Sequence, residues 1–309
     1  MTADDQWVVR RMMDSLDHRG PDGEGLWTGE QVILGHRRLA IIDLAGGYQP
    51  LFNETRDIGV VNNGEIYNYR ELTSELKTAG HTFTTASDTE VLVHGYEQWG
   101  DDFVSHLRGM FAFALWDGRR RRLLLGRDRF GVKPLYYANT RDRLLFASEI
   151  KSLFADPAVP RELNTDRLAE YLAFRSVAGE ETLFKGIREI APGTVMVCEN
   201  GRFTERKYWS PEVEITGGAE TPQLLERGRE LLSDSVVARL VSDVPLGTIT
   251  SGGLDSSLVS AIAAEHTLQI DTFCVGFADP AYDERPFARV VADRIHSKHH
   301  TIEVSPEDI

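Results

Sequence analysis

The sequence predicts two domains of different fold classes: an α+β domain with antiparallel sheet, followed by an α/β domain with a parallel sheet. Its 309 residues, 41% hydrophobic and 27% charged, are enough for two separate cores. Hairpin patterns dominate residues 1–210, whereas helices and strands alternate in residues 223–309. Residues 211–222 contain Pro, Gly and Thr and are interpreted as the linker.

The first domain begins with a predicted helix and contains three predicted hairpins. Residues 2–20 show Thr2 at an N-cap position, acidic residues in the first turn, later arginines and Gly20 at the end. Short apolar runs joined by turn residues indicate antiparallel hairpins. The hairpins are predicted over residues 111–128, 134–148 and 195–203.

Two further helices are predicted between the strands. Asn68 followed three residues later by Glu71 is typical of a capping box, and the helix is expected to end at Gly80. Ser87 and Glu90 repeat the pattern for a helix that ends near residue 100. These helices complete the α+β prediction for the first domain.

The second domain shows a regular alternation of elements. Leucines and a valine recur at helical spacing between residues 224 and 240. Strands are then predicted at 245–250, 272–277 and 299–304, with helices at 254–266 and 285–295 between them. Such alternation predicts a parallel sheet with right-handed crossovers.

A loop between a predicted strand and helix, TSGGLDSSL at residues 250–258, has the composition of an anion site. Its glycines and hydroxyl groups let backbone N–H groups close on a phosphate at the positive end of the helix dipole. A plain glycine-rich turn with helix-capping residues is the alternative. No lysine follows the glycines, so cleavage between the α and β phosphates fits better than transfer of the terminal phosphate.

Charge and composition exclude several classes of partner. Lys and Arg total 34 against 48 for Asp and Glu, giving a net charge of −14, which disfavours nucleic acid and anionic membranes. The two cysteines, Cys198 and Cys274, suggest neither a disulfide framework nor a cysteine-rich metal site. With no signal-peptide pattern and no apolar run of membrane-spanning length, the cytoplasm is the expected location.

Several motifs carry a family resemblance. SGGLDSS resembles the pyrophosphate-binding loop of the ATP pyrophosphatases. Five motifs of the first domain together resemble the glutaminase domain of the glutamine-hydrolysing asparagine synthetase family. They are HRGPDGEG (residues 18–25), GHRRLAIIDL (35–44), NNGEIYNY (62–69), SDTE (87–90) and RDRFGVKPLYY (127–137). The resemblance implies an N-terminal-nucleophile sandwich, with antiparallel sheets between helices, before a parallel sheet of the ATP pyrophosphatase type.

The glutaminase motifs imply a glutamine pocket. A guanidinium group can hold a carboxylate through two parallel hydrogen bonds, and the resemblance gives Arg38 the α-carboxylate of glutamine. A surface arginine is the alternative, and it is accepted for the neighbouring Arg37. Leu39 and Ile41 would line the same pocket by resemblance.

The remaining pocket residues would act on the amide and the ammonium group of glutamine. Asn63 can offer a side-chain N–H and Gly64 a backbone N–H to a developing oxyanion, as amide hydrolysis requires. An ordinary Asn-Gly turn is the alternative. By resemblance, Glu65 accepts the ammonium group, with Asp88 as its companion.

For the second domain the resemblance implies adenylation of aspartate. ATP and the aspartate side chain would form a β-aspartyl adenylate, and ammonia from glutamine would convert it to asparagine, with Mg²⁺ at Asp255. A homodimer is a further expectation. The implied ATP-binding residues are Thr250, Ser251, Gly252, Gly253, Leu254, Asp255, Ser256 and Val275.

Departures from the family pattern leave two other functions open. The family's N-terminal cysteine nucleophile and first strand are not in this sequence, so an open sheet edge and no glutaminase activity of this chain by itself are expected. Thr2 could replace the cysteine but fits a helix cap better. The second domain carries only three predicted strands, and Thr250 stands where leucine is frequent. The alternatives are a natural-product synthetase or peptide cyclase, and a noncatalytic nucleotide-binding protein.

Overall fold

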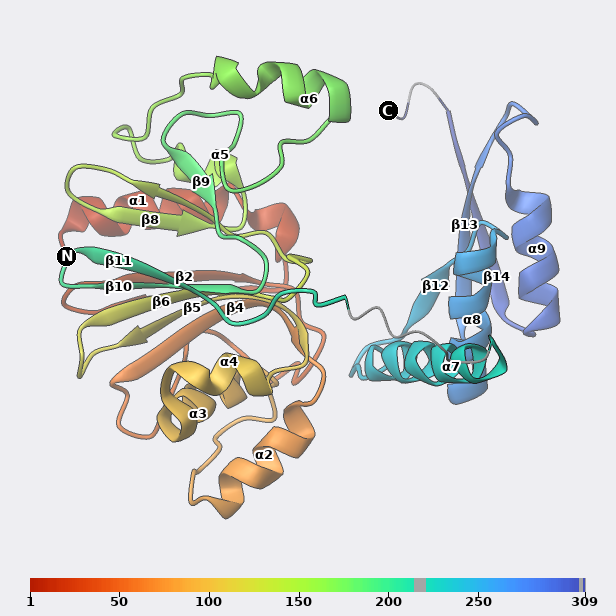
Figure 1. Ribbon diagram of the computed structural model, residues 1–309, viewed down its shortest axis with the longest axis horizontal. Helices are drawn as coiled ribbons and strands as arrows, with labels where there is room; N and C mark the ends of the chain where they lie inside the picture. The colour runs from red at the N-terminus through yellow and green to blue at the C-terminus, as the bar shows by residue number, and fades with distance from the viewer. Residues whose placement is uncertain (214–220, 306–307, 309) are drawn as a thin grey trace. The chain divides into compact units, whose positions relative to one another are not determined.

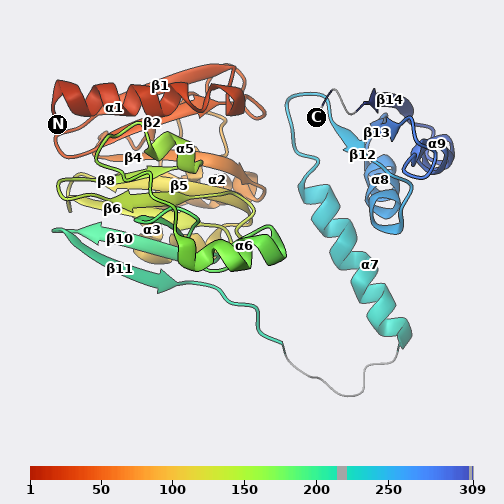
Figure 2. The same ribbon diagram turned by 90° about the horizontal axis from the view of Figure 1, so that it is seen from above.

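The computed structural model describes residues 1–213, 221–305 and 308, and it divides into two compact units. Unit 1 spans Met1–Glu212 and unit 2 spans Val213–Ile309 (Figures 1 and 2). Of the expected linker 211–222, residues 214–220 lie outside the described residues, and helix α7 begins at Thr221. Each unit is described by itself below.

Unit 1 is built on a six-stranded antiparallel sheet. Its strand order is β11-β10-β6-β5-β4-β3, and helices α2, α3 and α4 cover one face (Figure 1). Leucine, valine and phenylalanine side chains fill the space between that face and the helices. The bounds are β3 (Leu51–Phe52), β4 (Ile58–Ile66), β5 (Gly109–Asp117), β6 (Arg122–Arg127), β10 (Thr194–Glu199), β11 (Arg202–Lys207), α2 (Tyr69–Thr78), α3 (Glu90–Trp99) and α4 (Phe103–His106).

The other face packs on two smaller antiparallel sheets. One has the order β1-β2 and the other β8-β7-β9, and a second apolar core lies between them and the large sheet. Helices α1 and α5 cover the outer side over a third core, which completes a helix–sheet–sheet–helix sandwich. The bounds are β1 (Gly23–Thr28), β2 (Ile33–Arg38), β7 (Tyr136–Asn139), β8 (Leu144–Ala147), β9 (Ile187–Glu189), α1 (Ala3–Asp14), α5 (Ile150–Leu153) and α6 (Leu168–Phe174).

All three predicted hairpins are present, as β5–β6, β7–β8 and β10–β11. Within the described parts of the chain, the only strand that pairs with β2 is β1, beside an isolated bridge between Arg38 and Pro21, and the only strand that pairs with β8 is β7. Both strands thus lie at sheet edges, as do β1, β3, β9 and β11, so the open edge expected from a missing first strand stays a prediction. Residues of both strands line one cavity, described below.

Capping of the helices agrees with the sequence at Thr2 and differs elsewhere. Thr2 accepts a hydrogen bond from the Asp5 amide at 3.2 Å, and Asp5 accepts one from the Thr2 amide at 2.6 Å, so Thr2 caps α1. The helix ends at Asp14 instead of Gly20, because a separate 3₁₀ turn follows at Asp17–Arg19.

Neither of the other two predicted capping boxes forms. Asn68 stands at the N-cap of α2, but its side chain binds the His106 carbonyl and the Arg108 amide before β5, at 2.9 and 2.8 Å. Helix α3 begins at Glu90. Its buried carboxylate accepts hydrogen bonds from the backbone amides and the hydroxyl groups of Thr84 and Thr85. In both cases the side chain that the pattern assigned to the cap forms hydrogen bonds with backbone groups of a neighbouring loop instead.

Unit 2 confirms the predicted alternation. A parallel sheet with the order β12-β13-β14 is joined by α8 and α9, after the long helix α7 (Figure 1). The bounds are α7 (Thr221–Ala238), β12 (Gly247–Ile249), α8 (Leu254–His266), β13 (Asp271–Phe277), α9 (Arg285–Arg294) and β14 (Lys298–Val304). No helix in the described ranges combines the length and apolar character needed to cross a bilayer.

Candidate active site and nucleotide loop

A cavity of about 760 Å³ in unit 1 gathers all the residues that the sequence assigned to the glutamine pocket. They come from the end of β2, from β4 and from the segment before α3, which are distant in sequence. The sheet packing therefore brings the separate motifs to one place. These residues are Arg38, Leu39, Ile41, Asn63, Gly64, Glu65 and Asp88.

The Asn63–Gly64 pair lies within strand β4, so the alternative of a tight turn is wrong. Gly64 has φ +145° and faces Phe111 of β5 in the ladder. A Cβ atom on Gly64 would lie 2.0 Å from the Met110 carbonyl oxygen, so only glycine fits without displacement of β5. The Asn63 side-chain amide donates to the Ser148 hydroxyl at 3.3 Å.

Arg38 is buried at the end of β2 and holds the following turn. Its guanidinium donates to the carbonyls of Leu44, Ile42 and Asp43 at 3.2, 3.2 and 2.6 Å. It also lies over the Tyr48 ring, 4.8 Å from the ring centre. These bonds use three of about five guanidinium N–H groups. The positive charge is thus fixed at the cavity wall.

Asp88 places a buried carboxyl group at the cavity, beside the partly exposed Glu65. Asp88 is 5% exposed, and one oxygen accepts from the Ile66 amide at 2.8 Å. Burial and, to a smaller extent, the negative charge of Glu65 raise the pKa of Asp88 to about 6, against the opposing effect of the backbone hydrogen bonds. Two adjacent carboxyl groups provide a site that favours a cation.

His36 and Ser148 line the same cavity and were not predicted. The His36 Nε2 donates to the Asn62 carbonyl at 3.1 Å, while Nδ1 is buried without a hydrogen-bond partner in the described chain. Burial lowers the pKa of His36 to about 4, so the ring is neutral near pH 7. Strand alternation puts residues 36 and 38 on one side of β2, which could have indicated His36. No sequence signal marks Ser148.

Asp88→Asn is expected to stabilise unit 1 at neutral pH and to leave it unchanged near pH 4. Between about pH 4 and 6, Asp88 is protonated in the folded protein and ionised in the unfolded chain. The contribution of Asp88 to the free energy of unfolding of the wild type therefore falls as the pH rises through this range. The difference between variant and wild type should grow by about 3 kcal/mol from pH 4 to 7. The low pKa of His36 makes the free energy of unfolding rise with pH, but it does so equally in the wild type and in the Asp88 variant.

Urea unfolding followed by tryptophan fluorescence measures this difference, because all five tryptophans (residues 7, 27, 99, 116 and 209) lie in unit 1. A stability difference that stays constant from pH 4 to 7 would contradict the assigned pKa of Asp88.

The loop at residues 250–253 of unit 2 follows the carboxyl end of β12 and leads into α8. Gly252 has φ +80°, and a Cβ atom there would lie 2.4 Å from the Cβ of Phe287 on α9. Gly253 is the N-cap of α8, and no side chain caps it. The first-turn amides of α8 therefore lack a side-chain acceptor, as an anion site requires.

Hydroxyl groups surround this loop. The Ser251 and Ser256 hydroxyls are 3.1 Å apart, and the Ser251 amide donates to Ser256 at 3.2 Å. The buried Thr250 hydroxyl has no hydrogen-bond partner among the described residues. Leu254 and Asp255 are exposed in the first turn of α8, and Val275 is 44% exposed on β13. The predicted ATP-binding residues thus lie at the carboxyl ends of β12 and β13 or at the start of α8.

The sandwich of unit 1 is of the N-terminal-nucleophile type. Its fold is shared with a solved glutamine phosphoribosylpyrophosphate amidotransferase from Bacillus subtilis, with a TM-score of 0.50 at 16% identity over 97% of this chain and 79% of that one. Residues 1–209 match the glutamine amidotransferase domain family, and the chain belongs to that family. Residues 227–309 match the asparagine synthase family model.

Two relatives illustrate the similarity. Asparagine synthetase [glutamine-hydrolyzing] 1 of Bacillus subtilis is 37% identical over 99% of this chain and 48% of its own length. Asparagine synthetase [glutamine-hydrolyzing] of Zea mays is 36% identical over 92% of this chain and 45% of its own. The chain thus spans about half the length of the curated relatives that it matches.

Proposed function

We propose that this chain carries the glutamine pocket and the pyrophosphate loop of a synthetase that makes asparagine from aspartate, glutamine and ATP. The observation that carries the proposal is the gathering of separate motifs, from residue 38 to residue 88, on one cavity. The matches to the amidotransferase and synthase families support it, and so do the names of the relatives. A homodimer in the cytoplasm belongs to the same proposal.

In unit 1, each pocket residue would meet one group of glutamine. Arg38 would bind the α-carboxylate through guanidinium N–H groups that the turn carbonyls leave over. Glu65 and Asp88 would accept hydrogen bonds from the α-ammonium group. The Asn63 amide and the Gly64 N–H would stabilise the oxyanion formed when the side-chain amide is attacked. This arrangement orients glutamine with its reacting carbon at β4.

In unit 2, the loop would bind the β and γ phosphates of ATP. The carboxylate of aspartate would attack the α-phosphorus, pyrophosphate would leave, and ammonia would displace AMP from the resulting mixed anhydride. The amides at the start of α8, with the hydroxyls of Ser251 and Ser256, would bind the departing pyrophosphate. Val275 would contact the adenosine.

A magnesium ion also fits this site. Asp255 presents an exposed carboxylate in the first turn of α8, and oxygen ligands of this kind suit Mg²⁺. When bound, the ion would neutralise the negative charge that develops on the leaving pyrophosphate.

The proposal is tested by supplying the full-length natural protein with aspartate, ATP and glutamine labelled with ¹⁵N in its side-chain amide. We expect ¹⁵N in the asparagine formed, together with AMP and pyrophosphate in equal amounts. Turnover of ATP to AMP that needs neither aspartate nor glutamine would favour the natural-product synthetase or cyclase. Nucleotide binding with no turnover would favour the noncatalytic protein, and either result would overturn the proposal.

A further inference from the structure

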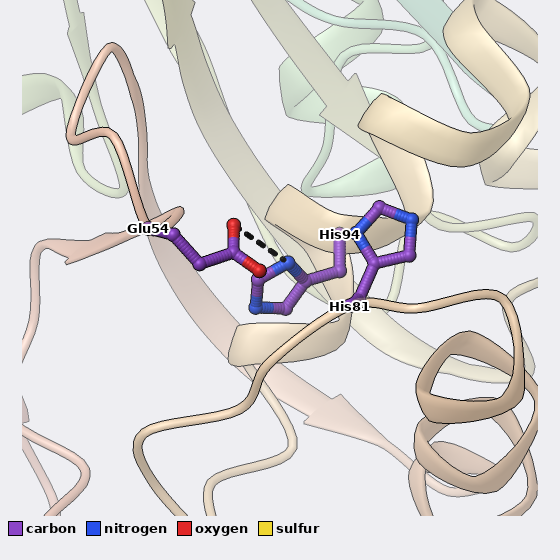
Figure 3. A group of neighbouring side chains, drawn as sticks. All are labelled: Glu54, His81 and His94. Carbon is purple, nitrogen blue, oxygen red and sulfur yellow. Dashed lines mark ion pairs between the residues drawn. The ribbon is translucent and has the colours of Figure 1, made fainter.

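A cluster of nitrogen and oxygen ligands lies away from the glutamine cavity. Glu54, His81 and His94 each offer one ligand atom, and these atoms all lie within 4.8 Å of one another (Figure 3). Glu54 lies in the turn between β3 and β4, His81 follows α2, and His94 is on α3. The cluster therefore joins three segments of unit 1. None of the three is among the residues that line the cavity.

His94 is completely buried, yet neither ring nitrogen has a hydrogen-bond partner among the described residues. Its Nδ1 lies 3.9 Å from Glu54 Oε2 and 3.4 Å from Glu97 Oε2, which is too far for a good hydrogen bond. A buried polar group without a partner costs about 1–3 kcal/mol. The buried Nδ1 atom of His94 thus faces the two carboxylates without a hydrogen bond to either, which leaves its lone pair available to a cation.

The two carboxylates are held by one oxygen each. Glu54 Oε1 accepts from the Thr82 amide at 2.8 Å, and Glu97 Oε1 accepts from the Asn53 side-chain amide at 2.8 Å. Their Oε2 atoms are the ones that approach the imidazoles, with Glu97 Oε2 3.7 Å from His81 Nδ1. Each carboxylate thus presents one oriented oxygen to the histidines.

These separations fit a small tetrahedral ion. With metal–ligand bonds of about 2.0–2.1 Å, the ligand atoms around zinc lie about 3.4 Å apart. Within the cluster the ligand atoms lie within 4.8 Å of one another, with Glu54 Oε2 3.9 Å from His94 Nδ1, and Glu97 Oε2 lies 3.4 and 3.7 Å from the two imidazoles. A bound ion would draw the three ligand atoms closer together. Imidazole nitrogens with carboxylate oxygens suit Zn²⁺ better than Mg²⁺ or Ca²⁺, which prefer oxygen alone.

A further carboxylate occupies the position of an outer support. Glu90 Oε1 lies 3.6 Å from His94 Nε2, on the ring atom opposite the proposed ligand Nδ1. A carboxylate that closes to hydrogen-bond distance of this atom would orient a metal-bound imidazole and strengthen it as a ligand. We propose that Glu54, His81 and His94, with Glu97 beside them, bind one zinc-class divalent cation. The ion links the β3–β4 turn to helix α3 and stabilises unit 1.

Zinc titration of the chelator-treated chain, in competition with a chromophoric zinc indicator, tests this proposal. We expect one equivalent to bind and the midpoint of thermal unfolding to rise. His81→Gln and Glu54→Gln should weaken binding at least tenfold, whereas His106→Gln, an exposed histidine of the same helical layer, should not. His94→Gln should abolish binding. The His81 and Glu54 variants keep the test decisive if that buried variant does not fold.

Two results would overturn the proposal. One is wild-type protein that takes up no zinc from the indicator, as expected if His94 is simply a protonated ring among carboxylates. The other is zinc binding that His81→Gln and Glu54→Gln leave unchanged. Because the cluster does not line the glutamine cavity, neither result bears on the proposed synthetase function.

Discussion

Gly64→Ala is expected to destabilise unit 1 by about 2 to 5 kcal/mol and to abolish glutamine binding. Gly64 has φ +145°, and the added Cβ would lie 2.0 Å from the Met110 carbonyl oxygen. Because this contact is with the backbone of the paired strand β5, no side-chain rotation relieves it. Strain and the displacement of the ladder both contribute. Urea unfolding followed by tryptophan fluorescence measures the change.

Gly80→Ala is the matched control for this variant. Gly80 also has a positive φ, +104°, but nothing lies within 4 Å of an added Cβ. It should therefore show only the conformational cost, about 1 to 2 kcal/mol. Equal effects of the two substitutions would contradict the close approach of β4 and β5 at Gly64.

Gly252→Ala is expected to weaken ATP binding at least tenfold. The residue has φ +80°, and an added Cβ would lie 2.4 Å from Phe287 Cβ and 2.5 Å from its carbonyl carbon. The loop would have to move away from α9, and its amides would no longer converge with those of α8 on one anion. Equilibrium binding of a fluorescent ATP analogue, with Mg²⁺ present, measures the loss.

Gly201→Ala is the matched control for this variant. Gly201 also has a positive φ, +72°, but no atom lies within 4 Å of an added Cβ. It should leave nucleotide affinity unchanged. Tight binding retained by the Gly252 variant would contradict the assignment of this loop to the nucleotide.

The sequence predicted unit 2 most closely. Helix α8 occupies the predicted residues 254–266, and strand β13 differs from its prediction by one residue. Alternating apolar strands and helices have strong periodic patterns, which explains this agreement. Helix caps were less predictable, because the side chain of Asn68 binds a loop 38 residues away instead of its own helix. Local patterns do not reveal such distant partners.

The site was predictable only where motifs were contiguous. NNGEI and SDTE pointed to Asn63 and Asp88, and the fold brings both to one cavity. The close fit of Gly64 against β5 depends on strand register, which the sequence does not show. His81 and His94 stand 13 residues apart, with Glu54 further away, so no metal-binding spacing marks them. Only the packing of α3 against the β3–β4 turn brings them together.

The central claim is that the cavity at β4 binds glutamine, and an NMR titration of the ¹⁵N-labelled chain with L-glutamine tests it most directly. We expect amide shifts at residues 63–65, 87–88 and 38–41, lost in Glu65→Gln and retained in Glu71→Gln, which changes an exposed carboxylate on α2. D-Glutamine should produce none. Shifts that lie elsewhere, or that persist in Glu65→Gln, would contradict the claim.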